Sequence, residues 1–73
     1  MIEFLRKFAE ENGLKFECIE DPKNDEIVFR FTNLRTNKRC GHRVRANILD
    51  RCGVDALAEI VRYTEKELLK ENV

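Results

Sequence analysis

Apolar and polar residues recur with two different periods along this chain, and each change of period marks a new element. Residues 2–12 carry apolar side chains about one helical turn apart on a single stripe, which predicts an amphipathic helix. The stripe consists of Phe4, Leu5, Phe8 and Ala9. Gly13 follows directly, and its tolerance of the left-handed conformation suits the end of a helix.

Three segments with a period of two follow, and we expect each to form a strand. They cover residues 14–20, 26–32 and about 38–45. The alternation is strongest in the second segment, where Ile27, Phe29 and Phe31 fall on one side. Short turn sequences separate the segments, so an antiparallel meander is the simplest pairing.

The rest of the chain predicts helix in two pieces. Residues 46–53 indicate a short helical turn that Asn47 caps and Gly53 ends. A longer helix follows with Asp55 as its N-cap, and apolar residues return every three or four positions on one of its faces. That face consists of Leu57, Ile60, Val61, Thr64 and Leu68.

The predicted order is therefore α-β-β-β-α, an α+β fold in which residues 1–73 form a single small domain. Each helix has one apolar stripe and the sheet has one strongly apolar face. We expect a three-stranded antiparallel meander with both helices packed on that face. The opposite face, called the open face below, is left to water or to a partner.

Charge is balanced overall but unevenly distributed. The chain has 14 basic and 14 acidic residues, yet the segment from Ile27 to Leu49 contains six basic residues and no acidic one. The six are Arg30, Arg35, Lys38, Arg39, Arg43 and Arg45. Such a basic middle between acidic ends could pair between two copies, with the basic sheet of one against the acidic helix of the other.

The composition also bounds the class of protein. No apolar run is long enough to span a bilayer, and the chain opens on an amphipathic helix rather than a signal peptide. Three cysteines is an odd number, which does not suit the disulfide framework of a small secreted protein. We therefore expect a cytoplasmic protein with reduced thiols and no membrane association.

The stretch RCGHRVR, residues 39–45, holds a cysteine, the only histidine and three arginines. Because side chains alternate along a strand, Cys40 and His42 share the core-facing side with Val44, and the arginines share the open face. Zinc needs about four converging ligands, so we expect no metal, although Cys40, His42 and Cys52 are the residues that could contribute to a site. In the core they act as small apolar side chains and a hydrogen-bonded ring.

No catalytic arrangement or cofactor site is predicted. A cysteine and a histidine that both point into packing cannot act on a substrate in a cleft. The glycines are scattered rather than gathered in a phosphate-binding loop. We therefore expect neither an enzyme nor a small-molecule substrate.

The arginines of the open face offer one possible contact surface. Arg30, Arg39, Arg43 and Arg45 would lie on it, with Arg35 and Lys38 near the hairpin tip, and phosphates could bind to such a footprint. The strand phenylalanines fall on the core side, so the face has no aromatic rings for base stacking. The alternative is a solvated face whose arginines cover the sheet and deter edge-to-edge pairing.

The element order and the opening sequence FLRKFAEENGLKFECIE resemble the double-stranded RNA-binding domain. The resemblance implies the same α-β-β-β-α fold. That family presents a lysine cluster at the start of its last helix, whereas the matching region here, GVDALAE, contains Asp55 and Glu59 and no lysine. Acidic groups there would repel phosphate, so we carry over none of that family's RNA-binding residues.

The expected function is that of a small binding module without catalytic activity. It would be an accessory or regulatory protein that docks a protein partner or a second copy of itself. Short proteins of this style resemble bacteriophage or mobile-element accessory proteins. Nucleic-acid binding through the open face is the alternative.

Overall fold

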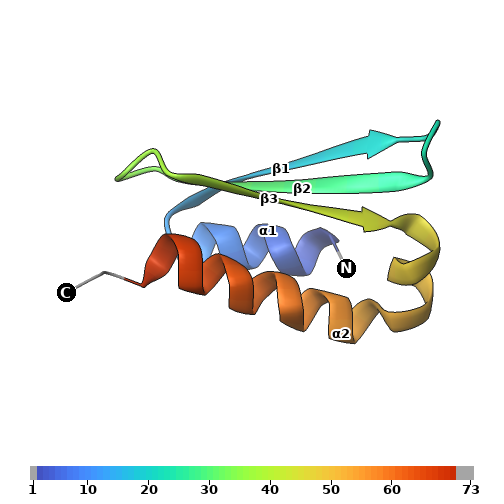
Figure 1. Cartoon of the computed structure of the whole chain (residues 1–73). Helices are drawn as coiled ribbons and strands as arrows, with labels where there is room; N and C mark the ends of the chain where they lie inside the picture. The colour runs from blue at the N-terminus through green and yellow to red at the C-terminus, as the bar shows by residue number, and fades with distance from the viewer. Residues whose placement is uncertain (1, 71–73) are drawn as a thin grey trace.

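The computed structural model describes residues 2–70, apart from the side chain of Cys52. It shows an N-terminal helix and a longer C-terminal helix beneath a three-stranded sheet (Figure 1). The predicted α-β-β-β-α order is confirmed. In chain order the elements are α1 (Ile2–Glu11), β1 (Leu14–Asp21), β2 (Glu26–Asn33), β3 (Arg39–Arg45), α2 (Ala46–Thr64) and η1 (Glu65–Leu69), a π-helical turn that continues α2.

The sheet is the predicted antiparallel meander, with β2 in the centre. Gly13 ends α1 in the left-handed conformation, with φ of 67°, as the sequence predicts. Asp25 and Asn37 also have positive φ, at 52° and 63°. Both belong to residue types that tolerate this conformation and favour tight turns, which is why each hairpin reverses within a few residues.

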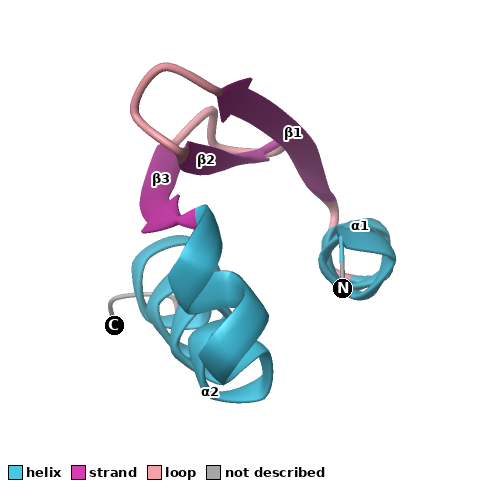
Figure 2. Ribbon diagram, turned by 90° about the vertical axis from the view of Figure 1, so that its right-hand side faces the viewer, coloured by secondary structure: helices cyan, strands magenta, loops and turns pink. Residues whose placement is uncertain are grey.

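Both helices lie on one face of the sheet, but beneath different edges of it. Viewed along the helices, α1 lies under β1, and α2 lies under β3 on the other side (Figure 2). The sheet curves over the space between them. The prediction that both helices pack on one face is confirmed. The sequence pattern did not show that the two helices lie under opposite edges of the sheet.

The core lies between the central strand and the two helices. Phe29 and Phe31 of β2 are almost completely buried, and the ring of Phe16 on β1 packs against both. The expected alternation of faces is confirmed, because Cys40, His42 and Val44 are half-buried whereas their β3 neighbours are exposed. The buried apolar residues are Leu5, Ala9, Leu14, Phe29, Phe31, Leu49, Ile60 and Leu68.

The prediction of two helical pieces after the sheet is wrong. A single helix, α2, begins directly after β3 and continues through Gly53. Asn47 and Asp55 lie inside it rather than at N-caps, and Arg45 occupies the N-cap position without a side-chain hydrogen bond. A helical glycine costs only about 1 kcal/mol relative to alanine, less than the burial of Leu49 on the same stripe contributes.

The buried side-chain amide of Asn33 joins the end of η1 to the β2–β3 hairpin. Nδ2 of Asn33 donates a hydrogen bond of 2.9 Å to the carbonyl of Leu68 in η1. Oδ1 of the same side chain accepts from the backbone N–H groups of Arg35 and Thr36, at 2.8 and 3.2 Å. One side chain thus fixes the hairpin turn and satisfies a carbonyl at the end of the helix.

Candidate interaction surfaces

The open face of the sheet is less basic than segment 27–49, which supplies most of its residues. Nη1 of Arg43 lies 3.1 Å from Oε1 of Glu26. Arg30 stands opposite Glu17 of β1 in the strand register. Two acidic residues from outside the 27–49 segment therefore lie among its arginines, and Ile19 of β1, which is also exposed, adds apolar surface.

The tip of the β2–β3 hairpin gathers cations from the middle and from the C-terminal part of the sequence. Arg35 and Lys38 lie with Lys66 and Lys70 around a hollow of about 700 Å³, which Glu67 also lines. Arg39 is exposed at the start of β3, and Arg45 is exposed at its far end. The six basic residues of the predicted footprint are thus divided between the tip and the body of the sheet rather than held in one patch.

Cys40 and His42 converge on a residue of α2 instead of forming a reactive pair. Nε2 of His42 lies 3.0 Å from Oγ1 of Thr64, which is fully buried. Sγ of Cys40 is 3.8 Å from the same hydroxyl and 3.8 Å from Nε2 of His42. Burial raises the pKa of the Cys40 thiol and lowers the pKa of His42. Both side chains are therefore neutral at pH 7 and join β3 to α2.

The candidate metal ligands do not assemble within the described part of the chain. Cys18 lies on β1, with β2 between it and Cys40. The side chain of Cys52 lies outside the described residues. Among residues 2–70, no three cysteine, histidine or acidic side chains are grouped closely enough to hold a metal ion.

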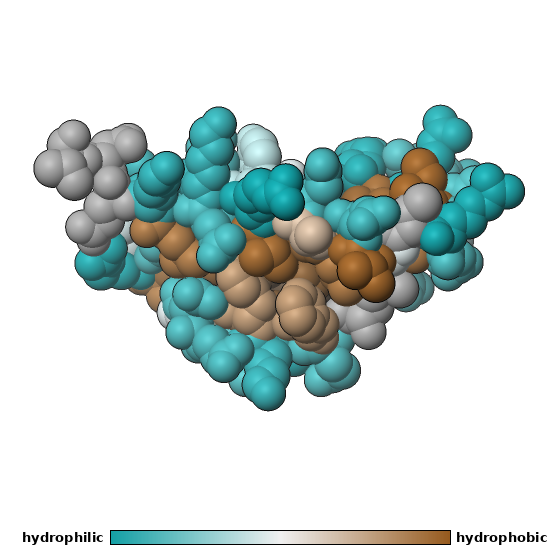
Figure 3. All heavy atoms as spheres, turned by 90° about the horizontal axis from the view of Figure 1, so that it is seen from below, coloured by the Kyte–Doolittle hydropathy of each residue, from teal (hydrophilic) through white to brown (hydrophobic). Residues whose placement is uncertain are grey.

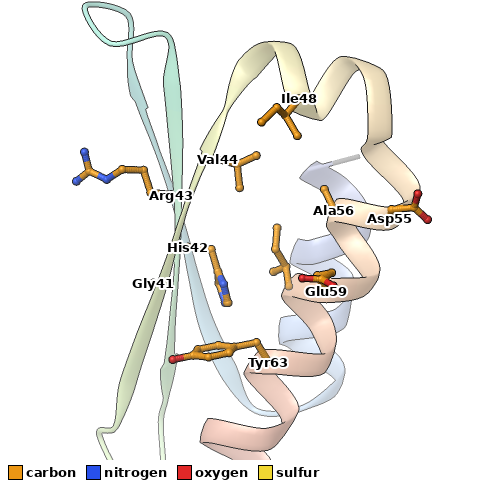
Figure 4. A pocket seen from close by; sticks show the side chains of 10 residues that line it. Gly41, His42, Arg43, Val44, Ile48, Asp55, Ala56, Glu59 and Tyr63 are labelled. Carbon is orange, nitrogen blue, oxygen red and sulfur yellow. The ribbon is translucent and has the colours of Figure 1, made fainter.

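Another hollow, of about 590 Å³, lies between β3 and α2 (Figure 4). The rings of His42 and Tyr63 meet edge to face in it, with centroids 5.1 Å apart. Asp55 and Glu59 line its α2 wall, and the side chain of Arg43 points away from it toward the open face. The α2 wall of this hollow is therefore acidic and would repel phosphate.

A third hollow lies between the two helices on the side away from the sheet, and we call it the inter-helix groove. Its volume is about 450 Å³. Phe4 is 57 % exposed and Val54 is 82 % exposed. From below, apolar side chains gather along the middle of this side, between polar rims (Figure 3). The groove is lined by Phe4, Val54, Leu57, Ala58, Val61, Arg62 and Glu65.

The sequence contained a signal for this groove, but the search for a single apolar face on the last helix missed it. Val54 and Ala58 extend the apolar stripe of α2 beyond the width that one sheet face covers. Apolar residues beyond the side that the sheet covers leave apolar surface for another contact. Splitting α2 at Gly53 hid this width, because Val54 then fell in a connection.

Comparison of the chain with protein-family models, with curated proteins and with solved structures finds no match. Within residues 2–70, none of the helices combines the length and the apolar character needed to cross a membrane.

Proposed function

We propose that this protein is a non-catalytic protein-binding module and that the inter-helix groove is its contact surface. The observation that carries the proposal is the exposure of Phe4 and Val54 beside Leu57 and Val61 in one hollow. A monomer of this size gains nothing by leaving such side chains in water, because each fully buried one is worth about 1.5–3 kcal/mol. Contiguous exposed apolar surface with a polar rim is typical of a protein interface.

The rim of the groove supports a partner of defined orientation. Arg62 and Glu65 border the apolar floor, and both side chains are exposed. Charged groups at the rim select partners and fix their register more than they add affinity. This arrangement suits an accessory or regulatory protein of the cytoplasm, in the style of bacteriophage or mobile-element accessory proteins.

Site-specific photocrosslinking in the native cell tests the proposal. A photoreactive benzoylphenylalanine at Arg62, on the rim of the groove, is expected to give a covalent adduct with a protein. The same group at Lys23, in the exposed β1–β2 turn, is the matched control and is expected to give none. Absence of any adduct from position 62 would remove the groove as a contact surface.

Nucleic-acid binding is the second candidate, and the hairpin tip favours it more than the open face does. Four cations gather there around one acid, Glu67, and they are Arg35, Lys38, Lys66 and Lys70. Two acids, Glu17 and Glu26, lie among the arginines of the sheet. Cations without stacking rings give affinity for phosphates that falls steeply as salt rises.

Gel retardation at low salt tests this second candidate. Lys38→Glu together with Lys66→Glu is expected to abolish a retarded complex with RNA or DNA, because two phosphate contacts become repulsive. Lys7→Glu together with Lys23→Glu makes the same change of charge at exposed positions away from the tip. Equal loss with both pairs would show only a response to net charge, and no retardation of the unmodified protein would end the idea.

A further inference from the structure

We propose that the partner in the inter-helix groove is a second copy of this chain, with the two α2 helices antiparallel across a two-fold axis at Ala58. The inference rests on the proposed function and names the partner for the same surface. Three features of α2 carry it: the spacing of the exposed residues, the small residue at their centre, and the signs of the charges at the two ends.

The exposed flank of α2, continued by Glu65 at the start of η1, has the spacing of a helix–helix seam. Its positions recur at alternating intervals of three and four residues, which keeps them on one narrow stripe facing a neighbouring helix. They are Arg51, Val54, Ala58, Val61 and Glu65. Val61 is half-buried and the other four are exposed, so within the described chain no element covers this seam.

Alanine at the centre of the seam suits the crossing point of two helices. A small side chain lets two backbones approach to the short end of the usual 8–10 Å separation. In a two-fold symmetric pair the residue on the axis meets its own copy. Val54 and Val61 lie on either side of Ala58, so each valine of one copy would pack against a valine of the other.

The charges at the two ends of the seam are complementary only in the antiparallel arrangement. Arg51 and Glu65 each lie seven residues from Ala58, about 10 Å along the helix. Antiparallel pairing about Ala58 therefore places Arg51 of each copy beside Glu65 of the other. Parallel pairing would instead bring like charges together. Within residues 2–70, neither side chain forms an ion pair inside its own chain.

A second set of charges on the outer flank agrees with this geometry. Asp55 lies three residues before Ala58 and Arg62 lies four residues after it, and both side chains are exposed. The same two-fold axis brings the acid of one copy close to the arginine of the other. Phe4 of α1 borders the groove as well, so the incoming helix would contact both helices of its partner.

Pairing of the sheets is less favourable than pairing of the helices. If two β3 edges paired antiparallel, arginines of one copy would stand opposite arginines of the other, which is destabilising. Docking of the basic sheet against an acidic helix is weakened because Glu26 already engages Arg43. On the flank of α2, antiparallel pairing brings apolar residues together and places opposite charges of the two copies side by side.

Sedimentation of the purified full chain tests the proposal. Protein concentrations from about 5 to 500 µM span the dissociation constants of weak dimers. The expected result is a concentration-dependent species of twice the 8.7 kDa chain mass. Ala58→Glu places a carboxylate on the axis beside its own copy, and we expect dimerisation at least about a hundredfold weaker. Lys23→Glu in the exposed β1–β2 turn also introduces a carboxylate, and as the matched control it should leave dimerisation unchanged.

A charge exchange then tests the orientation. Arg51→Glu alone or Glu65→Arg alone is expected to weaken dimerisation by about tenfold, since two ion pairs become two repulsions. Both substitutions together are expected to restore it. The two positions are about 20 Å apart in one helix, so rescue can arise only between copies. Both side chains are exposed, and circular dichroism of each variant checks that the fold is intact.

The results separate this inference from the proposed function. A protein that stays monomeric over the whole range, or a dimer that none of these substitutions weakens, overturns the self-association. A dimer without rescue by the double exchange overturns the antiparallel register. If the crosslinker at position 62 captures a different protein while the purified chain is monomeric, the groove remains a binding surface and its partner is not this chain.

Discussion

The two sides of α2 carry similar apolar residues but have opposite surroundings. Ile60 is only 4 % exposed beneath the sheet, whereas Val54 is 82 % exposed on the flank. The buried side is closed by specific contacts, with Thr64 bound to His42 and the helix end bound to Asn33. The exposed side has apolar side chains with a charged residue at each end of the seam, and no element of the described chain covers it.

This difference shows that apolar character alone does not assign a residue to the core. Ile60 stabilises the fold because it is buried in the core cluster, while Val54 contributes only when another molecule covers it. The buried side therefore governs the free energy of unfolding in dilute solution, and the exposed side is the one through which we propose that the protein associates. Three predictions test that division.

The largest effect is expected from truncation on the buried side. Ile60→Ala should lower the free energy of unfolding by about 2–5 kcal/mol, because it removes buried methyl groups and leaves a cavity. Val54→Ala should change it by no more than about 0.5 kcal/mol in dilute protein. Urea unfolding at low micromolar concentration measures both, and equal losses would show that the flank is covered within the monomer.

A smaller loss is expected at the tie between the hairpin and the helix end. Asn33→Ala leaves the carbonyl of Leu68 and the N–H of Arg35 without their side-chain partner, at a cost of about 1–3 kcal/mol. Asn24→Ala, which removes an exposed hydrogen bond to Asp21, is the control and should cost less than about 0.5 kcal/mol. Urea unfolding compares the two, and a similar small loss for both would mean that the buried amide adds nothing.

The smallest effect is expected from titration of His42. Burial lowers the pKa of this ring in the folded protein, so the unfolded chain binds a proton at higher pH than the folded one. The stabilisation is complete above the unfolded pKa of about 6.5 and is lost as pH falls from there toward the lower folded pKa.

Urea midpoints at pH 7.5 and 5.5 measure the loss. His42→Gln keeps a polar group near Thr64 but does not titrate, so its midpoint should fall less between the two pH values. The same decline in both proteins would assign the pH dependence to other groups.

Much of the fold follows from local pattern. Alternation fixed the inward side of each strand, since a shift of one residue would bury the arginines of β3. Gly13 was correctly placed at a helix end because a positive φ is a local requirement. The break at Gly53 was wrong because the stability of a helix depends on the packing of its stripe, and the stripe joins Leu49 to Ile60.

The candidate surfaces were predicted less completely. The six basic residues were identified, but their neighbours were not, because Glu17, Glu26 and Lys66 come from other parts of the sequence. The pairing of Thr64 with His42 and of Asn33 with Leu68 likewise joins residues more than 20 positions apart. Such contacts depend on how elements pack and have no local signature.

The sequence by itself determined the order of elements, the antiparallel meander and the separation of RCGHRVR into a core-facing and an exposed set, because each follows from the period of the side chains along one element. The tertiary structure decided where the helices lie beneath the sheet and what each charge meets. By placing α1 and α2 under opposite edges (Figure 2), it left Val54 and Ala58 uncovered, because the curved sheet covers only one side of each helix.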